Sequence, residues 1–409
     1  MRLSQVFGRA SGRSLILLAA LTAASPVLAQ PSAVRLSESE AVARALADAD
    51  FAGLLEARRA AAKAEAEAIG RFANPSVTAR RGEVSGAAQD EVEWEVGLVQ
   101  PLHVTRRRAA ERDAALAQAA VVDADMVWRV EQRRAEVRRA YTACGVAEAA
   151  ADAKRGFVQR LTEVERIVSE RTEAGDTAVY DLRRVRVEAR TAAADAQLAV
   201  GETEAECLAL GRLTGVTGAR PTSSAIASAG ATGAIARADL LAGQRRVEAA
   251  SSLTRAAERS RWPDIEVGLG WRRLETAGFQ ADGPQISVGA TIPLFDRGAA
   301  RVSAARARER AEAADLALAR RAAETQVGVA QVRARSAAEA LRLAETSRAD
   351  FSRLGAIAAT AYASGETGVT ELVDAYRAAH EAELSTIELT GRASLAAIEL
   401  DLAQGGPTI

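Results

Sequence analysis

The chain contains the stretch GDTAVYDL at residues 175–182 and, 190 residues later, the closely similar stretch GETGVTEL at residues 365–372. Shorter matches occur in the same order at nearly the same spacing: Asn74-Pro75 with Trp262-Pro263 at 188 residues, and Pro101-Leu102 with Pro293-Leu294 at 192 residues. Ordered matches at one offset indicate an internal repeat. The sequence therefore predicts two copies of one structural unit, with small differences in loop length.

Each of the two stretches follows a long segment with helical character. Residues 106–173 contain no proline, and residues 298–363 form the matching segment of the second copy. A helix of this length spans about 100 Å at 1.5 Å per residue. Gly175 and Gly365 are expected to end these helices, so that helices over 177–213 and 367–403 return beside them. Each copy is thus predicted to hold a long helical hairpin, over 106–213 and 298–403.

Small apolar residues recur along the long helices at alternating spacings of four and three, the pattern of a coiled-coil seam. The seam of the first copy comprises Ala110, Ala114, Ala117, Val121, Ala124 and Trp128, and the second copy repeats it with Ala300, Ala304, Ala307, Ala311, Ala314 and Leu318. Shorter helices are expected over 37–71 and 236–261. The first of these opens with a capping-box pattern at Ser37 and Glu40.

Four short segments, two per copy at about 74–101 and 264–293, have the period of a strand with one apolar face. The apolar face, expected to meet lipid, comprises Val92, Trp94, Val96, Val267, Leu269, Trp271 and Val288. The polar face, expected to line a water-filled lumen, comprises Glu91, Glu93, Glu95, Glu266 and Arg272. Four strands cannot close a wide barrel, and open edges are not tolerated in lipid. Membrane strands would therefore have to come from several chains, whereas a soluble sheet packed on a helix is the alternative.

Composition excludes several classes of function. The 409 residues are 48% hydrophobic but only 4% aromatic, and the net charge is −1, so binding of nucleic acid through bulk positive charge is not expected. His103 and His380 lie far apart, and Cys144 and Cys207 have no CxxC partner, so we predict no metal site, no disulfide framework and no cofactor. No catalytic residues are expected, because no catalytic triad or phosphate-binding loop can be assembled.

The first residues read as a targeting segment. Three arginines precede the apolar run LILLAAL at residues 15–21, and Val27-Leu28-Ala29 offers a cleavage site. We therefore predict a signal peptide at 1–29. The first repeat follows at 30–213, a linker rich in Gly, Ser and Thr at 214–235, the second repeat at 236–403 and a tail at 404–409.

A signal peptide is followed by two copies of a unit made of a helix, two strands and a long helical hairpin. This arrangement resembles that of the TolC-type outer-membrane efflux protein family. Stretches that carry the resemblance are LSESEA at 36–41, RADLL at 237–241, PLFD at 293–296 and the Gly175 and Gly365 turns. The segment Gln100-Pro101-Leu102 runs into an arginine-rich helix start and looks closest to the cobalt–zinc–cadmium efflux branch. Drug exporters of the family have similar sequence features.

The resemblance implies a mainly α fold in which duplicated long helical hairpins form an α-helical barrel. Four strands per chain would complete a 12-stranded transmembrane β-barrel in a homotrimer. The protein would be a passive exit duct, not an enzyme, in the outer membrane with its helical tunnel in the periplasm. Its partners would be outer-membrane lipid, a periplasmic membrane-fusion adaptor and an inner-membrane transporter of the resistance-nodulation-division type.

The hairpin turns are the expected contact with the adaptor, through Gly175, Asp176, Thr177, Gly365, Glu366 and Thr367. A competing interpretation is a periplasmic coiled-coil adaptor or structural protein without a barrel. That interpretation accounts for the hairpins and the seams. It leaves unexplained why alternating segments recur at equivalent positions of the two copies.

Overall fold

The computed structural model describes residues 33–86, 90–102, 106–222 and 237–405. The predicted signal peptide, His103, the last four residues and most of the predicted linker lie outside these residues. The described part is mainly helical with a small sheet, as predicted. None of its helices is both long and apolar enough to cross a membrane.

The first repeat begins with two helices rather than the single one predicted over 37–71. Helix α1 spans Glu38–Leu46 and helix α2 spans Ala49–Gly70. The helix is interrupted between them because the Asp48 carboxylate caps α2 by accepting the Phe51 backbone N–H at 2.9 Å. The capping box at Ser37 and Glu40 is confirmed at the start of α1. Strands β2 (Ser76–Ser85) and β3 (Asp90–Leu102) follow, then helices α3 (Arg107–Glu173) and α4 (Val179–Thr214).

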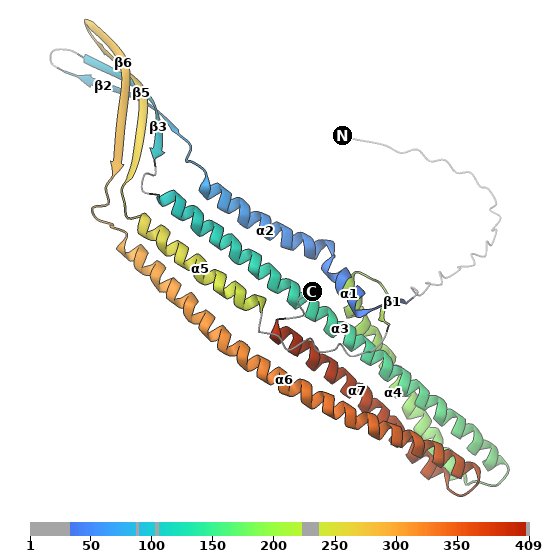
Figure 1. Ribbon diagram of the computed structural model, residues 1–409. Helices are drawn as coiled ribbons and strands as arrows, with labels where there is room; N and C mark the ends of the chain where they lie inside the picture. The colour runs from blue at the N-terminus through green and yellow to red at the C-terminus, as the bar shows by residue number, and fades with distance from the viewer. Residues whose placement is uncertain (1–32, 87–89, 103–105, 223–236, 406–409) are drawn as a thin grey trace, which may run out of the picture. The chain divides into compact units, whose positions relative to one another are not determined.

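The second repeat has the same order of elements (Figure 1). Helix α5 (Ala238–Arg259) leads into strands β5 (Asp264–Thr276) and β6 (Phe279–Thr291), and helices α6 (Ala299–Ala363) and α7 (Val369–Gln404) form the second long hairpin. The sheet and the two hairpin turns lie at opposite ends of the long helices.

One small sheet was not predicted. Strand β1 (Val34–Leu36) pairs in parallel with β4 (Ala219–Pro221), which lies inside the stretch predicted to be a linker. Leu36 and Ala219 are buried in a cluster with Val137 of α3 and Leu210 of α4. This pairing anchors the start of the first repeat to the end of its hairpin.

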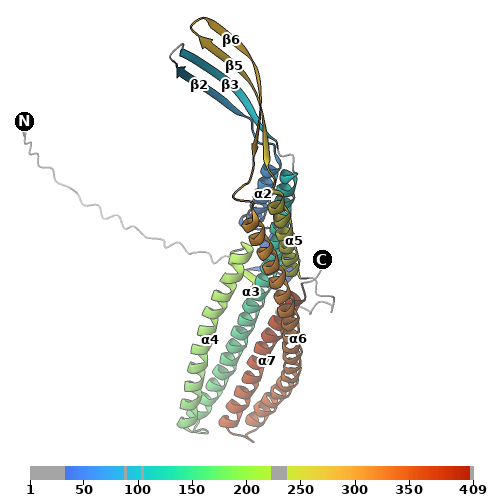
Figure 2. The ribbon, with the colours of Figure 1, turned by 90° about the vertical axis from the view of Figure 1, so that its left-hand side faces the viewer.

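The four longer strands form one antiparallel sheet in the order β2-β3-β5-β6 (Figure 2). The central pair joins the two repeats, with Val96 opposite Trp271 and Leu98 opposite Leu269. Strands β2 and β6 are its two edges.

The two predicted seams behave differently. In the first copy Ala114, Val121 and Ala124 are buried, because α3 packs against α2, α4, α5 and α7. In the second copy the corresponding residues are all exposed, and Leu318 is 57% exposed. The prediction of a packed seam does not hold for the second copy within the single chain, since α6 packs mainly against α5 and α7 and this face stays uncovered among the described residues.

The expectation of no disulfide is also wrong. Cys144 of α3 and Cys207 of α4 are bonded to each other, with Cα atoms 4.7 Å apart. The two helices are antiparallel arms of one hairpin, so residues at equal distances from the turn face each other. Cys144 lies 31 residues before Gly175 and Cys207 lies 32 residues after it, which places the two thiols side by side.

Candidate functional site: a two-faced sheet and paired hairpin turns

The strand register places the two predicted sets of residues on opposite faces of the sheet. Directly paired residues share a face. One row of paired residues crosses all four strands and is apolar and exposed: Val77, Leu98, Leu269 and Ile286. The next row, on the other face, reads Ser76, Val99, Gly268 and Ser287.

The predicted apolar set lies on the face of the first row. Val96 pairs with Trp271, Leu98 with Leu269, and Val267 with Val288, while Val92 and Trp94 follow on the same side of β3. Trp94, Val96, Leu269, Trp271 and Val288 are each about half exposed or more in the single chain. Apolar side chains left exposed over most of one face indicate that this face meets an apolar surrounding.

Charged residues bound this apolar face at the end of the sheet far from the helices. Arg81 lies over the Trp94 ring at 5.4 Å, and Arg273 pairs directly with Trp94 across the strands. Trp271 donates its indole N–H to Asp282 at 3.1 Å. Trp94 and Trp271 therefore stand between an apolar band and a charged rim, the position of tryptophan at a membrane interface.

The predicted lumen residues all fall on the opposite face. Arg272 forms an ion pair with Glu93, and Glu95 accepts a hydrogen bond from Arg80 at 3.4 Å. Sequence analysis missed Arg80, because Arg81 obscures the alternation of β2 and only the register assigns a face to each of the two arginines.

On the polar face, the paired residues at the centre of the β3–β5 junction between the two repeats are glycines without side chains. Gly97 and Gly270 are paired there, and a Cβ on Gly270 would lie 2.8 Å from the Val96 carbonyl oxygen. Glycine is required because the two central strands approach too closely for a side chain.

The two hairpin turns, which hold all six predicted tip residues, have the same backbone geometry. Gly175 and Gly365 adopt φ of +85° and +78°, and each follows the C-cap residue of its helix, Ala174 or Ser364. The Asp176 N–H donates to the Arg171 carbonyl at 2.8 Å, and the Glu366 N–H donates to the Ala361 carbonyl at 2.9 Å. These are Schellman motifs that end α3 and α6. Asp176 and Glu366 are exposed, whereas Thr177 and Thr367 are half-buried.

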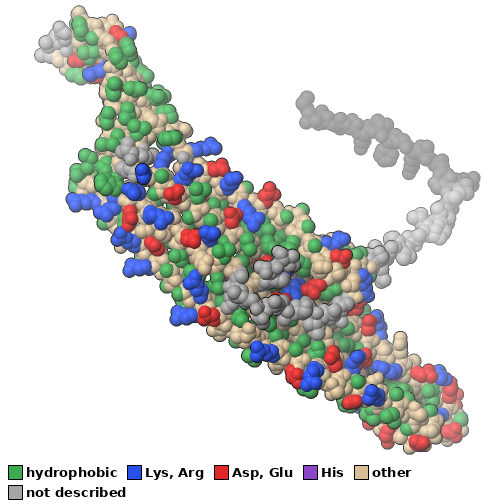
Figure 3. Space-filling view, in the orientation of Figure 1, with side chains coloured by type: hydrophobic (Ala, Val, Ile, Leu, Met, Phe, Trp, Pro, Cys, Tyr) green, Lys and Arg blue, Asp and Glu red, His purple; other side chains and the backbone are tan. Residues whose placement is uncertain are grey.

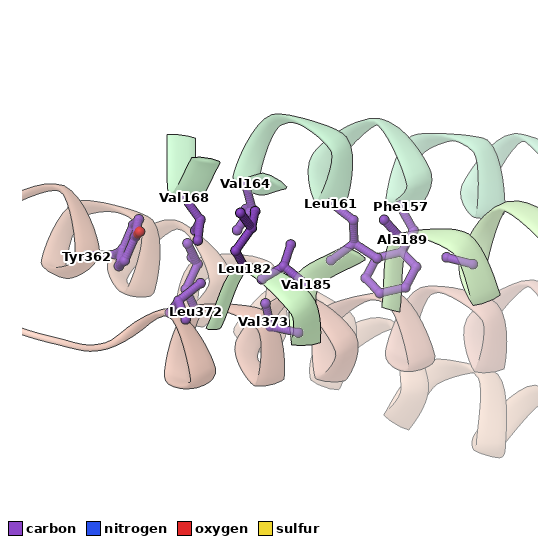
Figure 4. Close-up of a cluster of buried hydrophobic side chains, with 12 residues drawn as sticks. Phe157, Leu161, Val164, Val168, Leu182, Val185, Ala189, Tyr362, Leu372 and Val373 are labelled. Carbon is purple, nitrogen blue, oxygen red and sulfur yellow. The ribbon is translucent and has the colours of Figure 1, made fainter. Parts of the chain in front are cut away.

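The two hairpins pack on each other just above these turns (Figure 4). Val164 and Val168 of α3, Leu182 and Val185 of α4 and Leu372 of α7 belong to one buried cluster, shown with sticks in the close-up. Polar contacts add to it. Arg377 of α7 pairs with Glu188 of α4 at 2.9 Å, and the Arg171 guanidinium of α3 lies 4.8 Å from the Tyr362 ring of α6.

A histidine lies within the interface between the hairpins. The His380 ring of α7 stacks on Phe157 of α3 with centroids 4.3 Å apart, and only 8% of the residue is exposed. Its Nδ1 is buried without a hydrogen-bond partner among the described residues. Burial lowers the pKa of His380, while Glu383 acts in the opposite direction. The neutral ring is therefore the form that the folded chain favours.

Within the described residues, no group of His, Cys, Asp and Glu side chains is arranged to hold a metal ion. The sheet and the turns remain the candidate functional surfaces.

Comparisons with known proteins agree with this architecture. The profile of the family described as outer membrane efflux protein matches residues 234–406. No protein of curated function matches the chain by sequence.

Solved structures resemble the chain over almost its whole length. CusC, whose crystal structures concern folding and transmembrane channel formation, is 17% identical with a TM-score of 0.77, covering 91% of this chain and 93% of its own. The outer membrane protein VceC from Vibrio cholerae is 17% identical with a TM-score of 0.73, covering 91% and 97%. The open MtrE outer membrane channel of Neisseria gonorrhoeae is 17% identical with a TM-score of 0.71, covering 90% and 89%.

At these identities the structural likeness establishes the fold, which is that of outer membrane channel proteins such as CusC, VceC and MtrE. The second repeat in addition matches the model of the outer membrane efflux protein family over residues 234–406.

Proposed function

We propose that the protein is the passive exit duct of a tripartite efflux pump in the outer membrane, assembled as a homotrimer. The observation that carries the proposal is a sheet with one apolar and one polar face, joined to two long helical hairpins. Three chains would supply twelve strands, in which β2 of one chain pairs with β6 of the next. This closure satisfies the backbone groups along both edges, as a hydrocarbon environment requires.

Exposed apolar residues on the helices support the trimer. The seam of α6 from Ala300 to Leu318 has no packing partner within the described part of its own chain. Val332 and Ile357 of the same helix are 67% and 65% exposed, and Leu198 of α4 is 68% exposed. Alanine-rich faces allow close approach of helix axes, so a neighbouring chain is the natural partner for this surface. Packing all of these faces around one axis would close an α-helical barrel.

The polar face of the sheet would line the lumen. Glu91, Glu93, Glu95 and Glu266 outnumber Arg80 and Arg272 on that face, and three chains would repeat each carboxylate in a ring. Such rings favour cations over anions. The duct would give solutes, metal cations or drugs among them, a hydrated route past the hydrocarbon, without catalysis or a bound cofactor.

The turns would contact a periplasmic membrane-fusion adaptor, with an inner-membrane transporter of the resistance-nodulation-division type supplying energy. Their equivalent geometry supports this role, because a trimer would present six similar turns at its periplasmic end. Val179 and Tyr180 beside the first turn are 57% and 70% exposed, whereas Val369 beside the second is 5% exposed. The first turn thus offers the more apolar contact surface.

Deletion of residues 365–369 tests this proposal. The deletion should abolish export, measured as resistance of cells to toxic solutes, and leave the amount of trimer in the outer membrane unchanged. A matched control inserts five Gly and Ser residues after Gly278, in the β5–β6 turn at the other end of the molecule, and should keep export. Normal resistance in the deletion strain would refute the role of the turns. A chain without a barrel, the adaptor alternative, would instead be recovered in the soluble periplasmic fraction.

A further inference from the structure

The connections between helices and sheet carry exposed apolar side chains. Phe72 links α2 to β2 and is 85% exposed, and Trp262 links α5 to β5 and is 60% exposed. The β6–α6 connection presents Phe295, which is fully exposed, beside Leu294 at 66%. The fourth connection, 103–105, lies outside the described residues. All three described connections therefore place large apolar groups at the same level, between the sheet and the helices.

Positive charge gathers directly beside these groups. We define the arginine belt as residues 71–75, 106–117, 255–263 and 292–312, which are the described connections together with the adjoining ends of α3, α5 and α6. The belt holds thirteen arginines against six carboxylates, whereas residues 76–102 and 264–291 hold four arginines against nine carboxylates. Figure 3 shows basic side chains gathered over the helix ends below the sheet. The belt is strongly positive in a chain whose net charge is −1.

Some of the belt arginines are neutralised within the chain. Arg107 pairs with Asp264 at 2.7 Å and with Glu111 at 2.8 Å, and Arg306 pairs with Glu258 at 2.6 Å.

Others carry unbalanced charge. Arg71, Arg259 and Arg297 are exposed and form no ion pair with a carboxylate of the described residues. Each of the three lies within three residues of an exposed aromatic side chain in the sequence: Phe72, Trp262 and Phe295.

Aromatic side chains next to unpaired arginines match the chemistry of a membrane surface. Aromatic rings settle at the level of the headgroups, and basic side chains near an anionic surface are attracted to the lipid phosphates. The belt also continues the apolar face of the sheet, which ends at Ile292 where the β6–α6 connection begins. We propose that the arginine belt binds anionic phospholipid headgroups of the leaflet from which the helices emerge. This proposal rests on the proposed function, because it requires the sheet to lie in the membrane.

Native mass spectrometry of the purified full-length trimer tests the proposal. The protein is incubated with equal amounts of phosphatidylglycerol and phosphatidylcholine that have identical acyl chains, and the lipids retained are counted. The wild type should retain phosphatidylglycerol at least about fivefold over phosphatidylcholine, since one basic residue near an anionic surface contributes about that factor. The preference should shrink at about 0.5 M salt, where charges are screened.

The test variant combines Arg71→Gln, Arg259→Gln and Arg297→Gln and should lose the preference. The corresponding lysine variant keeps the charge and should retain it. A control with the same change of charge uses exposed arginines far from the belt, Arg190→Gln, Arg333→Gln and Arg353→Gln, and should behave as wild type. Equal retention of both lipids by the wild type would overturn the proposal. A full preference in the belt variant would overturn it as well.

Conductance of the same preparations in phosphatidylcholine bilayers separates this proposal from the proposed function. Conduction together with equal retention of the two lipids would overturn the lipid site alone. Absence of both conduction and trimers would overturn the two proposals together.

Discussion

Replacement of Leu98 by lysine tests the orientation of the sheet. Leu98 lies in the apolar row that crosses all four strands, and it is midway between Trp94 and Leu102 on β3. The eight residue steps from Trp94 to Leu102 cover about 27 Å along the strand. With a strand tilt of about 40°, this length spans about 21 Å along the membrane normal, most of an apolar band about 25 Å tall. Leu98 is therefore expected near the middle of the bilayer.

The expected cost follows from this depth. A lysine on the lipid face near the midplane of a barrel destabilises it by about 2–4 kcal/mol. The trimer would carry the substitution three times, so the barrel should lose about 6–12 kcal/mol. A loss of this size should deplete the folded trimer from the outer membrane.

The neighbouring residue provides the control. Val99 is also aliphatic, but its row contains Ser76, Gly268 and Ser287 and lies on the polar face. Val99→Lys should therefore leave the trimer close to wild type, because the ammonium group would reach water in the lumen. The assay is the amount of trimer in purified outer membranes, together with the guanidinium midpoint of the extracted trimer. Equal effects of the two substitutions would refute the assignment of faces.

Other predictions concern the helical part. Replacing Cys144 and Cys207 together by alanine should cost about 4 kcal/mol in the chain-entropy treatment of a loop of 63 residues, seen as a lower guanidinium midpoint that reductant no longer changes. Because the pKa of His380 is lowered in the fold, the unfolded chain takes up the proton first, so stability should fall as pH drops below about 6.5. His380→Phe should flatten the difference between the thermal midpoints at pH 7.5 and pH 5; an unchanged difference would contradict this. Arg138→Leu should cost about 3–5 kcal/mol in chemical denaturation, because it removes the cation that pairs with buried Asp401 at 2.8 Å. Arg139→Leu, which removes only an exposed ion pair, should cost less than about 1 kcal/mol, and equal losses would argue against a special role of Arg138.

Much of the fold follows from periodicity in the sequence. Alternation over Glu91 to Leu98 assigns each side chain to a face, because the side-chain period of a strand is two and a pairing register cannot change it. The ends of α3 and α6 follow from Gly175 and Gly365, since only glycine enters the left-handed region without strain. These features are local, so individual residues in the sequence are enough to predict them.

Features that depend on partners were harder to predict. The Cys144–Cys207 disulfide requires the register of the hairpin, although the equal distances of the two residues from Gly175 hold that information. Strands β1 and β4 have three residues each, too few for a period to be visible. The seam of α6 has the right spacing for packing, but a heptad does not identify the helix that covers it.

The face on which Arg80 lies was hard to predict because the alternation of β2 is weak. A period of two from Val77 places Arg81 on the apolar face, which obscures the pattern, and the pairing of Arg80 with Glu95 assigns Arg80 to the polar face. Charged residues in a weakly alternating strand thus gain a role once the register of the neighbouring strand is known.

The central claim is that one chain is incomplete and that three chains form a duct in the outer membrane. Fractionation of cell envelopes, followed by native mass determination of the detergent-extracted protein, tests this most directly. The account predicts recovery in the outer membrane with a mass of three copies. A monomer in the soluble periplasmic fraction would contradict it.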